Sequence, residues 1–265
     1  MGPNLVNWLS HVDGFWAGEL GLSAAALRWD GFHVCERADP ERQPRAIVVA
    51  TSSAIILSLP RGRASAFEAA GLNLAEMKSA PRRYLSGLYS NSSLEVRGPA
   101  YLAYWPPSSQ VPPPQGLIRE LSAAGGDSLT ALRDLAPEEW SEAGIGADSR
   151  VFGALAAGRT LAVAGYECWP AQLAHLQVFC LPDYRRRGLA TNALRGAMRH
   201  ALAAGLLPQY RARDANLASR ALATRLGFVE YGWMATVLVC LPNHTVQRPG
   251  AFGAPKGADL GRYAD

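Results

Sequence analysis

The sequence predicts a mixed α/β fold, in which helices flank a central sheet. Hydrophobic residues make up 49% of the 265 residues and charged residues 18%, a balance typical of globular proteins. The second half of the chain also alternates strand-like and helix-like segments. A helix expected at 191–204 separates two such strands, 174–181 and 207–213, and can join them in parallel as a crossover.

Residues 1–105 mix short helical and strand-like segments, and we expect them to form an N-terminal α+β domain. β-branched runs at 46–51 and 54–59, joined by Ser52-Ser53, predict a hairpin. The remaining expected elements are helices at 4–11, 23–27 and 64–70 and strands at 94–96 and 100–105.

A proline-rich segment, 106–115, separates the two halves. Its prolines have no backbone N–H to offer a sheet, so we expect a linker there. A second domain at 116–241 and a Gly/Pro-rich tail at 242–265 follow. Within the second domain we expect strands at 117–121, 151–156, 160–168 and 233–241, a turn at 157–159, and helices at 127–134, from 137 and at 216–226.

The net charge and the spacing of the cysteines argue against a nucleic-acid-binding protein and against a metal-binding protein. The net charge of +4 and pI near 9.0 permit acidic ligands, but the basic residues are dispersed and do not indicate nucleic-acid binding. The cysteines form no C-x-x-C pair and lie mostly in apolar stretches, which predicts reduced, buried thiols and no metal site. Cys180 is either a packing residue or a reactive thiol. The cysteines are Cys35, Cys168, Cys180 and Cys240.

No apolar run approaches the roughly 20 residues that span a bilayer. The first residues also lack a signal-peptide pattern. We therefore expect a cytoplasmic protein that does not act at a membrane.

Residues 178–194 are the most informative stretch of the sequence. An apolar strand leads through a proline turn and three arginines into a helix that opens at Gly188-Leu189-Ala190. Small residues let backbone N–H groups approach an anion, and a helix N-terminus and arginines attract one. The pattern predicts a pyrophosphate site; the alternative is a solvated basic surface.

Two motifs resemble the GNAT superfamily of acyl-CoA-dependent N-acyltransferases. Arg185–Ala190 resembles its Arg/Gln-x-x-Gly-x-Gly/Ala signature, approached through Pro182-Asp183-Tyr184, and a segment that begins at Asn216 and ends in Leu226-Gly227-Phe228 resembles a later helix of the family. The resemblance covers residues 116–240. It implies a mixed, splayed central sheet flanked by helices; residues 1–105 stay unassigned, or are a degenerate copy of the second half.

The resemblance implies acetyl-CoA as co-substrate. Backbone groups of Val178, Phe179 and Cys180 would pair with the pantetheine arm, and the Val178 N–H would support the oxyanion. Arg185 would structure the loop, and Arg186 and Arg187 would reach the 3′-phosphate. Asn216 would hydrogen-bond the arm or serve only as a helix N-cap. The residues expected at the pyrophosphate are Arg186, Arg187, Gly188, Leu189, Ala190 and Thr191, and Ser219 and Arg220 are expected beside the cofactor.

The sequence offers several candidates for the general base and for the group that protonates the leaving thiolate. Glu167 and His175 flank the Trp169-Pro170 turn and are expected to face each other across a hairpin. They are candidates for the general base, or else structural residues. Ala174 and Ala223 stand where the family often has a catalytic Glu and a proton-donating Tyr. Water, Tyr210 or Tyr231 would then protonate the thiolate.

The expected function is transfer of an acetyl or other acyl group to a primary amine of a small molecule, by direct attack of the amine. The alternatives are a protein N-acetyltransferase and a non-catalytic acyl-CoA-binding regulatory module. We expect a homodimer and no nucleic-acid partner. Aromatic residues of the first half either line the acceptor pocket or form ordinary core: Trp8, Phe15, Trp16, Tyr101, Tyr104 and Trp105.

Overall fold

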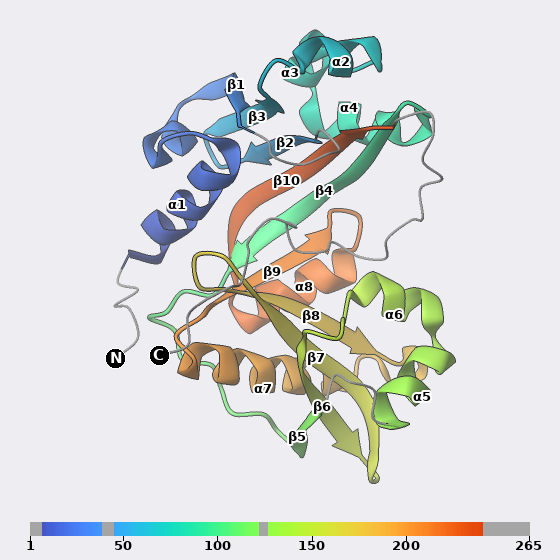
Figure 1. The fold of residues 1–265 in the computed structure, drawn as a ribbon. Helices are drawn as coiled ribbons and strands as arrows, with labels where there is room; N and C mark the ends of the chain where they lie inside the picture. The colour runs from blue at the N-terminus through green and yellow to red at the C-terminus, as the bar shows by residue number, and fades with distance from the viewer. Residues whose placement is uncertain (1–6, 39–44, 122–126, 241–265) are drawn as a thin grey trace.

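A computed structural model describes residues 7–38, 45–121 and 127–240. Their strands are β1 (Gly31–Arg37), β2 (Arg45–Ala50), β3 (Ala54–Pro60), β4 (Leu94–Tyr104), β5 (Ile118–Leu121), β6 (Arg150–Ala156), β7 (Arg159–Trp169), β8 (Leu173–Cys180), β9 (Leu207–Arg213) and β10 (Val229–Val239). All of them join one sheet in the order β1-β3-β2-β10-β4-β9-β8-β7-β6-β5 (Figure 1). The β1–β3 and β8–β9 pairs are parallel and the others antiparallel, so the predicted mixed sheet is confirmed.

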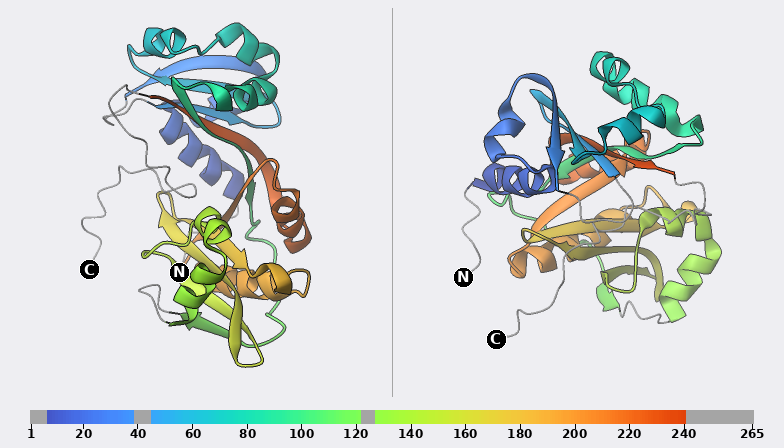
Figure 2. Two further views of the ribbon diagram at one scale, coloured as in Figure 1. Left: turned by 90° about the vertical axis from the view of Figure 1, so that its right-hand side faces the viewer. Right: turned by 45° about the horizontal axis from the view of Figure 1, so that its top comes forward.

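Helices cover both faces of this sheet. They are α1 (Trp8–Leu20), α2 (Ala64–Ala69), α3 (Leu74–Ser79), α4 (Pro81–Gly87), α5 (Asp127–Leu135), α6 (Pro137–Ala143), α7 (Leu189–Ala203) and α8 (Leu217–Leu226), with short 3-10 helices at Ala24–Arg28, Leu88–Ser90 and Pro182–Tyr184. One face packs against α1 and against α5 with α6. The opposite face packs against α2 to α4 and against α7 with α8 (Figure 2).

The second half follows the sequence prediction closely. Each expected strand and helix is present to within a few residues, and α7 connects the parallel strands β8 and β9 as the predicted crossover. Ala157 and Gly158 form the β6–β7 turn with φ angles of 48° and 74°, the left-handed conformation that two-residue hairpins need. Gly205 and Gly227 follow α7 and α8 with positive φ, as expected of helix ends. The predicted tail, 242–265, lies outside the described residues.

The first half departs further from the prediction. The 46–51/54–59 hairpin and the helix at 64–70 are confirmed as β2, β3 and α2. The helix expected at 4–11 is instead α1, which extends to Leu20 with Asn7 as its N-cap; residues 4–6 lie outside the described ranges. The strands expected at 94–96 and 100–105 are one strand, β4, because both of its parts pair with β10. The prediction missed β1, α3 and α4, whose sequences lack a sustained periodicity.

Strands from both sides of the proline-rich segment share the sheet. β4 lies between β9 and β10, and β10 also pairs with β2. The proline-rich segment itself runs along α7: Arg199 donates to the Val111 carbonyl at 3.1 Å, and the Asn192 amide exchanges two hydrogen bonds with the Gln115 backbone. The division of the chain into two domains at this segment stays a prediction.

Candidate functional site

The sheet opens between β8 and β9. The two strands pair only over Leu173–His175 and Leu207–Gln209, although β8 continues to Cys180 and β9 to Arg213. They therefore diverge beyond the pair His175–Gln209. The splayed sheet predicted from the resemblance is present, and this pair marks its closed end.

The free edge of β8 turns its backbone polar groups toward this opening. The Gln172 carbonyl accepts from Leu207 N on the β9 side, whereas Leu181 N donates to Leu161 on the β7 side. Because hydrogen-bonding direction alternates along a strand and the β7–β8 register is unbroken, the N–H and C=O groups of Val178 and Cys180 point toward β9. The backbone N–H and C=O groups of Phe179 point in the opposite direction, toward β7. The Phe179 ring packs on the Trp140 ring, with 5.3 Å between the ring centroids.

The turn after β8 leads into the N-terminus of α7. Arg186 and Gly188 adopt positive φ angles of 62° and 79°, and Gly188 is the N-cap residue, without a side-chain hydrogen bond to the first turn. Leu189, Ala190 and Thr191 form that turn, so their backbone N–H groups face outward from the helix end. An alternating turn of this kind followed by a helix N-terminus is a concavity suited to an anion.

The three arginines of the turn differ in their contacts. Arg185 donates from Nε to the Cys180 carbonyl at 3.3 Å and lies 3.6 Å from the Glu139 carboxylate, so it ties the turn to β8 and α6. The Arg187 guanidinium lies 5.2 Å from the centre of the Tyr184 ring. The side chain of Arg186 is exposed.

α8 brings its predicted cofactor residues to the same side of the sheet as α7. Asn216 caps α8, its side chain accepting from Ser219 N at 3.0 Å. Ser219 meets the Tyr210 hydroxyl of β9 at 2.9 Å between the two oxygens. Arg220 is engaged elsewhere: it donates to Asp214 at 3.0 Å and lies over the Tyr101 ring.

Glu167 and His175 are directly paired across the β7–β8 hairpin, as the sequence predicted. His175 is 5% exposed, stacks on Trp169 at 4.3 Å and contacts Gln209. Burial, assisted by the nearby Arg211 charge and opposed by the Gln209 hydrogen bond, lowers the pKa of His175 to about 3. The imidazole is therefore neutral at pH 7 and a weak base.

Glu167 is held by two residues that the sequence reading missed. Its Oε1 accepts from Gln177 Nε2 at 3.0 Å and from Ser149 Oγ at 3.4 Å. Gln177 also donates to the Gly144 carbonyl at 2.7 Å, so the loop after α6 fixes this cluster. Gln177 lies two residues after His175 and shares its face of β8, which is the signal that the sequence offered.

The two tyrosines considered as proton donors to the thiolate, Tyr210 and Tyr231, lie on opposite faces of the sheet. Tyr210 packs with Ala223 and Phe228 in the core under α7 and α8, and burial raises its pKa to about 12 against the opposing effect of the Ser219 hydrogen bond. Tyr231 lies under α1 and donates to Asp13 at 2.9 Å; burial and the Asp13 carboxylate raise the pKa of this phenol strongly. Tyr210 is the one that faces the helices of the predicted cofactor site.

The prediction of buried thiols is wrong for Cys168, which is exposed, and the other three cysteines are only half-buried. Tyr166 lies two residues before Cys168 on the same face of β7, and its hydroxyl contacts His200 in the last turn of α7. Cys168 therefore lies beyond the end of α7, and that helix does not cover it. Burial raises the pKa of Cys180, which disfavours a reactive thiolate. The described residues contain no group of three or more His, Cys, Asp or Glu side chains arranged to hold a metal ion.

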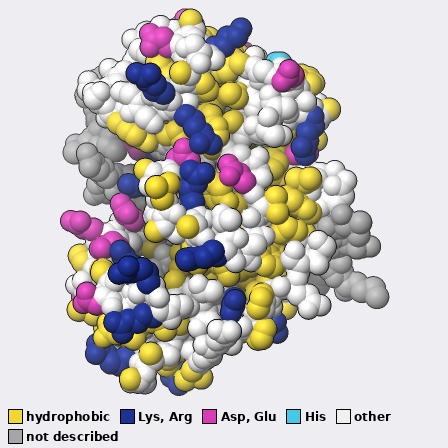
Figure 3. Space-filling view, turned by 180° about the vertical axis from the view of Figure 1, so that it is seen from behind, with side chains coloured by type: hydrophobic (Ala, Val, Ile, Leu, Met, Phe, Trp, Pro, Cys, Tyr) yellow, Lys and Arg dark blue, Asp and Glu magenta, His cyan; other side chains and the backbone are white. Residues whose placement is uncertain are grey.

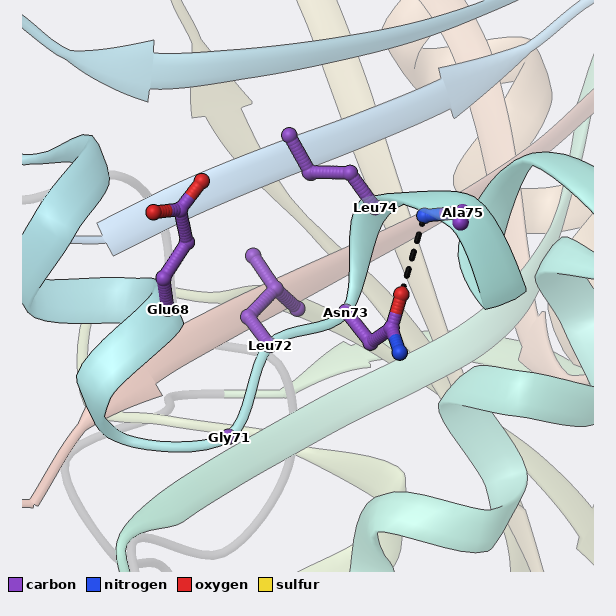
Figure 4. A pocket seen from close by; sticks show the side chains of 6 residues that line it. All are labelled: Glu68, Gly71, Leu72, Asn73, Leu74 and Ala75. Carbon is purple, nitrogen blue, oxygen red and sulfur yellow. Dashed lines mark hydrogen bonds between the residues drawn. The ribbon is translucent and has the colours of Figure 1, made fainter.

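The aromatic residues of the first half belong to two different cores. The α1 residues Trp8, Phe15 and Trp16 pack in one core with Tyr104 of β4. Tyr101 and Trp105 pack in the other core, against α7 and α8, so the six residues do not line one pocket. An open hollow instead lies between α2 and α3, lined by Glu68, Gly71, Leu72, Asn73, Leu74 and Ala75 (Figure 4). Its Asn73 amide caps α3 by accepting from Ala75 N, and we assign it no role.

Two further observations concern partners. None of the helices in the described ranges has the length and apolar character needed to cross a membrane. On the face in Figure 3, Lys and Arg side chains lie scattered among apolar and acidic ones, so this face carries no basic stripe.

Comparison with known proteins finds a family similarity in the second half of the chain. Residues 120–228 match the model of the acetyltransferase (GNAT) family. A comparison with curated proteins found no match.

Solved structures of GNAT proteins are similar to part of the chain. An acetyltransferase from Novosphingobium aromaticivorans is 25% identical over 57% of this chain and 69% of its own, with a TM-score of 0.45. One from Colwellia psychrerythraea is 15% identical over 69% and 76%, with a TM-score of 0.46. The aminoglycoside N-acetyltransferase AAC(6')-Iy, solved in complex with CoA, is 21% identical over 43% and 92%, with a TM-score of 0.35.

The family match covers β8 and β9, the strands on the two sides of the opening, and α7, the helix that follows β8. It leaves the first 119 residues outside. The match over residues 120–228 therefore supports an acyltransferase domain in the second half of the chain.

Proposed function

We propose that the protein transfers an acetyl group from acetyl-CoA to a primary amine of a small molecule. The observation that carries the proposal is the opening between β8 and β9, which leads directly to the N-terminus of α7. An elongated cofactor with amide groups along one part and phosphates at one end matches a free strand edge followed by an anion-binding turn. A cytoplasmic location and a homodimer stay predictions.

The cofactor is held mainly by backbone groups. Val178 and Cys180 pair with the amides of the pantetheine arm as an added strand would. The N–H groups from Arg186 to Ala190 and the Thr191 hydroxyl bind the pyrophosphate. Arg186 and Arg187 supply charge for the 3′-phosphate, and Arg185 keeps the turn in place through its bond to Cys180. The positive φ angles of this turn support the assignment.

The reaction is direct attack of a neutral amine on the thioester carbonyl. Glu167 takes the proton of the attacking nitrogen, directly or through water, because the low pKa of His175 makes the imidazole too weak a base for that step. The Val178 N–H donates to the developing oxyanion. The C–S bond breaks, and its electron pair goes to sulfur, which takes a proton from Tyr210.

Tyr210 is favoured as this donor by its place beside α8. Residues on a helix lean toward its N-terminus, so a side chain at Ala223 would extend toward Ser219, one turn earlier. The Tyr210 hydroxyl already meets Ser219 there. Ala223 is fully buried and small, which leaves room for the Tyr210 ring.

Calorimetric titration with acetyl-CoA, CoA and dephospho-CoA tests the cofactor assignment. We expect micromolar binding that weakens when the 3′-phosphate is absent. Turnover on a panel of small amines and N-terminal peptides then separates a small-molecule enzyme from a protein acetyltransferase. Absence of binding by all three nucleotides would refute the proposal.

The base is tested by Glu167→Gln, which keeps the shape of the side chain but cannot take a proton. We expect kcat to fall about 100-fold with unchanged binding of acetyl-CoA. Full turnover of this variant from pH 6 to pH 9 would exclude Glu167 as the base.

A further inference from the structure

Four polar side chains form a row across the sheet at the closed end of the opening. Strand register places Glu167 of β7 beside His175 of β8, His175 beside Gln209 of β9, and Gln209 beside Tyr104 of β4. Gln209 and Tyr104 are fully buried and His175 nearly so. Since burying polar groups is unfavourable unless they are hydrogen-bonded, a polar row in the middle of a core needs an explanation.

A chain of hydrogen bonds connects this row to the N-terminal helix. Trp16 of α1 donates from Nε1 to the Tyr104 hydroxyl oxygen at 2.9 Å, and Gln209 donates from Nε2 to the same oxygen at 2.7 Å. The other end of the Gln209 amide, Oε1, lies 3.2 Å from Nδ1 of His175. The first half of the chain therefore contacts the acyl-transfer domain at the point where β8 and β9 separate.

This chain of bonds selects one form of the histidine. A carbonyl oxygen only accepts hydrogen bonds, so the proton of the neutral imidazole lies on Nδ1 and the lone pair on Nε2. The groups that face His175 are the Trp169 ring, the Arg211 guanidinium and the Glu167 carboxylate. Burial and Arg211 keep the pKa near 3, so the imidazole stays neutral across the working range of pH.

We propose that Trp16, Tyr104 and Gln209 are positioning residues that hold His175 as the Nδ1–H tautomer, with Nε2 accepting a hydrogen bond from the acceptor amine beside Glu167. This proposal rests on the proposed function. It makes α1 part of the acyl-transfer site and gives the first half of the chain a role.

The two groups together define the class of amine. When a primary amine attacks, its nitrogen carries two hydrogens; one leaves as a proton to Glu167, and the other remains in the amide product. His175 Nε2 accepts from the hydrogen that remains. A secondary amine becomes a tertiary amide without N–H, so it loses this bond on the way to product and is the poorer acceptor.

The tautomer is measured on the intact protein without any reaction. Nitrogen-15 NMR of histidine-labelled protein, with the His175 signals identified by their loss in His175→Asn, distinguishes a protonated from a bare ring nitrogen. We expect protonated Nδ1 and bare Nε2, unchanged between pH 8 and pH 5. A protonated Nε2 at pH 8, or titration of this ring near pH 6.5, would overturn the proposal.

A second experiment compares the kinetics of Tyr104→Phe with those of Tyr231→Phe. Both remove a buried hydroxyl under α1, and the two rings pack against each other at 5.6 Å, but Tyr231 bonds Asp13 and lies outside the row. The probes are a primary amine that the panel identifies and its N-methyl derivative. We expect the wild-type protein to prefer the primary amine. Tyr104→Phe should lower kcat roughly 10- to 100-fold and reduce that preference, with unchanged Kd for acetyl-CoA.

Equal effects of the two variants on kcat, or an unchanged preference in Tyr104→Phe, would contradict the proposal. A wild-type protein that acetylates no amine would overturn the proposed function first. The NMR measurement would still report which nitrogen of His175 carries the proton, so the two failures are distinguishable.

Discussion

At the scale of single residues, Gly188 is the position on which the proposed anion site depends most. Its φ of 79° belongs to the left-handed region, and a Cβ there would meet no atom within 4 Å. A side chain at this position would therefore project into the space that the phosphates need, and strain would be limited to the backbone.

Gly188→Glu should abolish detectable acetyl-CoA binding, because a carboxylate then occupies a site built for an anion. The matched control is Gly158→Glu in the β6–β7 turn, where φ is 74° and the space is equally open. Both variants carry the same backbone cost of about 1–2 kcal/mol, so similar melting temperatures are expected. Retained binding in Gly188→Glu, measured by calorimetry, would argue against the pyrophosphate assignment.

Tyr210 is the residue whose hydroxyl we expect to matter for the leaving group. Tyr210→Phe should lower kcat about 100-fold and leave the Kd for acetyl-CoA unchanged. Tyr101→Phe is the control, since Tyr101 is a buried tyrosine of the same core. A Tyr210→Phe enzyme as fast as Tyr101→Phe in steady-state kinetics would assign thiolate protonation to water.

At the scale of elements, the cap of α8 connects stability with binding. Asn216 accepts from the Ser219 backbone, and we propose that its amide also donates to the cofactor. A carboxylate can cap a helix as well as an amide does, but it cannot donate. Substitution by Asp therefore separates the two roles.

Asn216→Ala should lower the free energy of unfolding by about 1 kcal/mol and weaken acetyl-CoA binding. Asn216→Asp should keep the stability and still weaken binding, as followed by thermal melting and calorimetry. Asn73, the N-cap of α3, gives the matched control: Asn73→Asp should leave binding unchanged. Wild-type affinity in Asn216→Asp would limit Asn216 to a capping role.

At the scale of the whole molecule, the sheet joins the two halves of the chain. β4 comes before the proline-rich segment, yet it lies between β9 and β10 and contributes Tyr101, Ala103 and Trp105 to the core under α7 and α8. Removing β4 would expose two strand edges and part of that core.

A fragment of residues 116–265 should therefore fail to form the native sheet by itself. Circular dichroism and two-dimensional NMR of the fragment should show no cooperative melting and poor chemical-shift dispersion. Co-expression with residues 1–115 should restore both. A dispersed spectrum and a cooperative transition of the fragment alone would support two independent domains.

Local patterns in the sequence determined the elements of the second half. A few neighbouring residues determine each of these local features, so the sequence alone could predict them: the turn before Gly188, the cap at Asn216 and the glycines after α7 and α8. The same holds for the backbone of the proposed anion site, because its strand, basic turn and helix N-terminus are contiguous. In the first half, β1, α3 and α4 have weak periodicity, and packing against the sheet determines them.

Only the tertiary structure decided which distant residues meet. Glu167 and His175 are eight residues apart and were predicted to face each other across a hairpin. Gln209, Tyr104 and Trp16 join them through strand order and helix docking, with sequence separations of up to 105 residues within a single hydrogen bond. No local pattern encodes such an alignment. The sequence by itself therefore determined the turn that we propose for the cofactor, whereas long-range strand pairing decided how the N-terminal helix reaches the closed end of the opening.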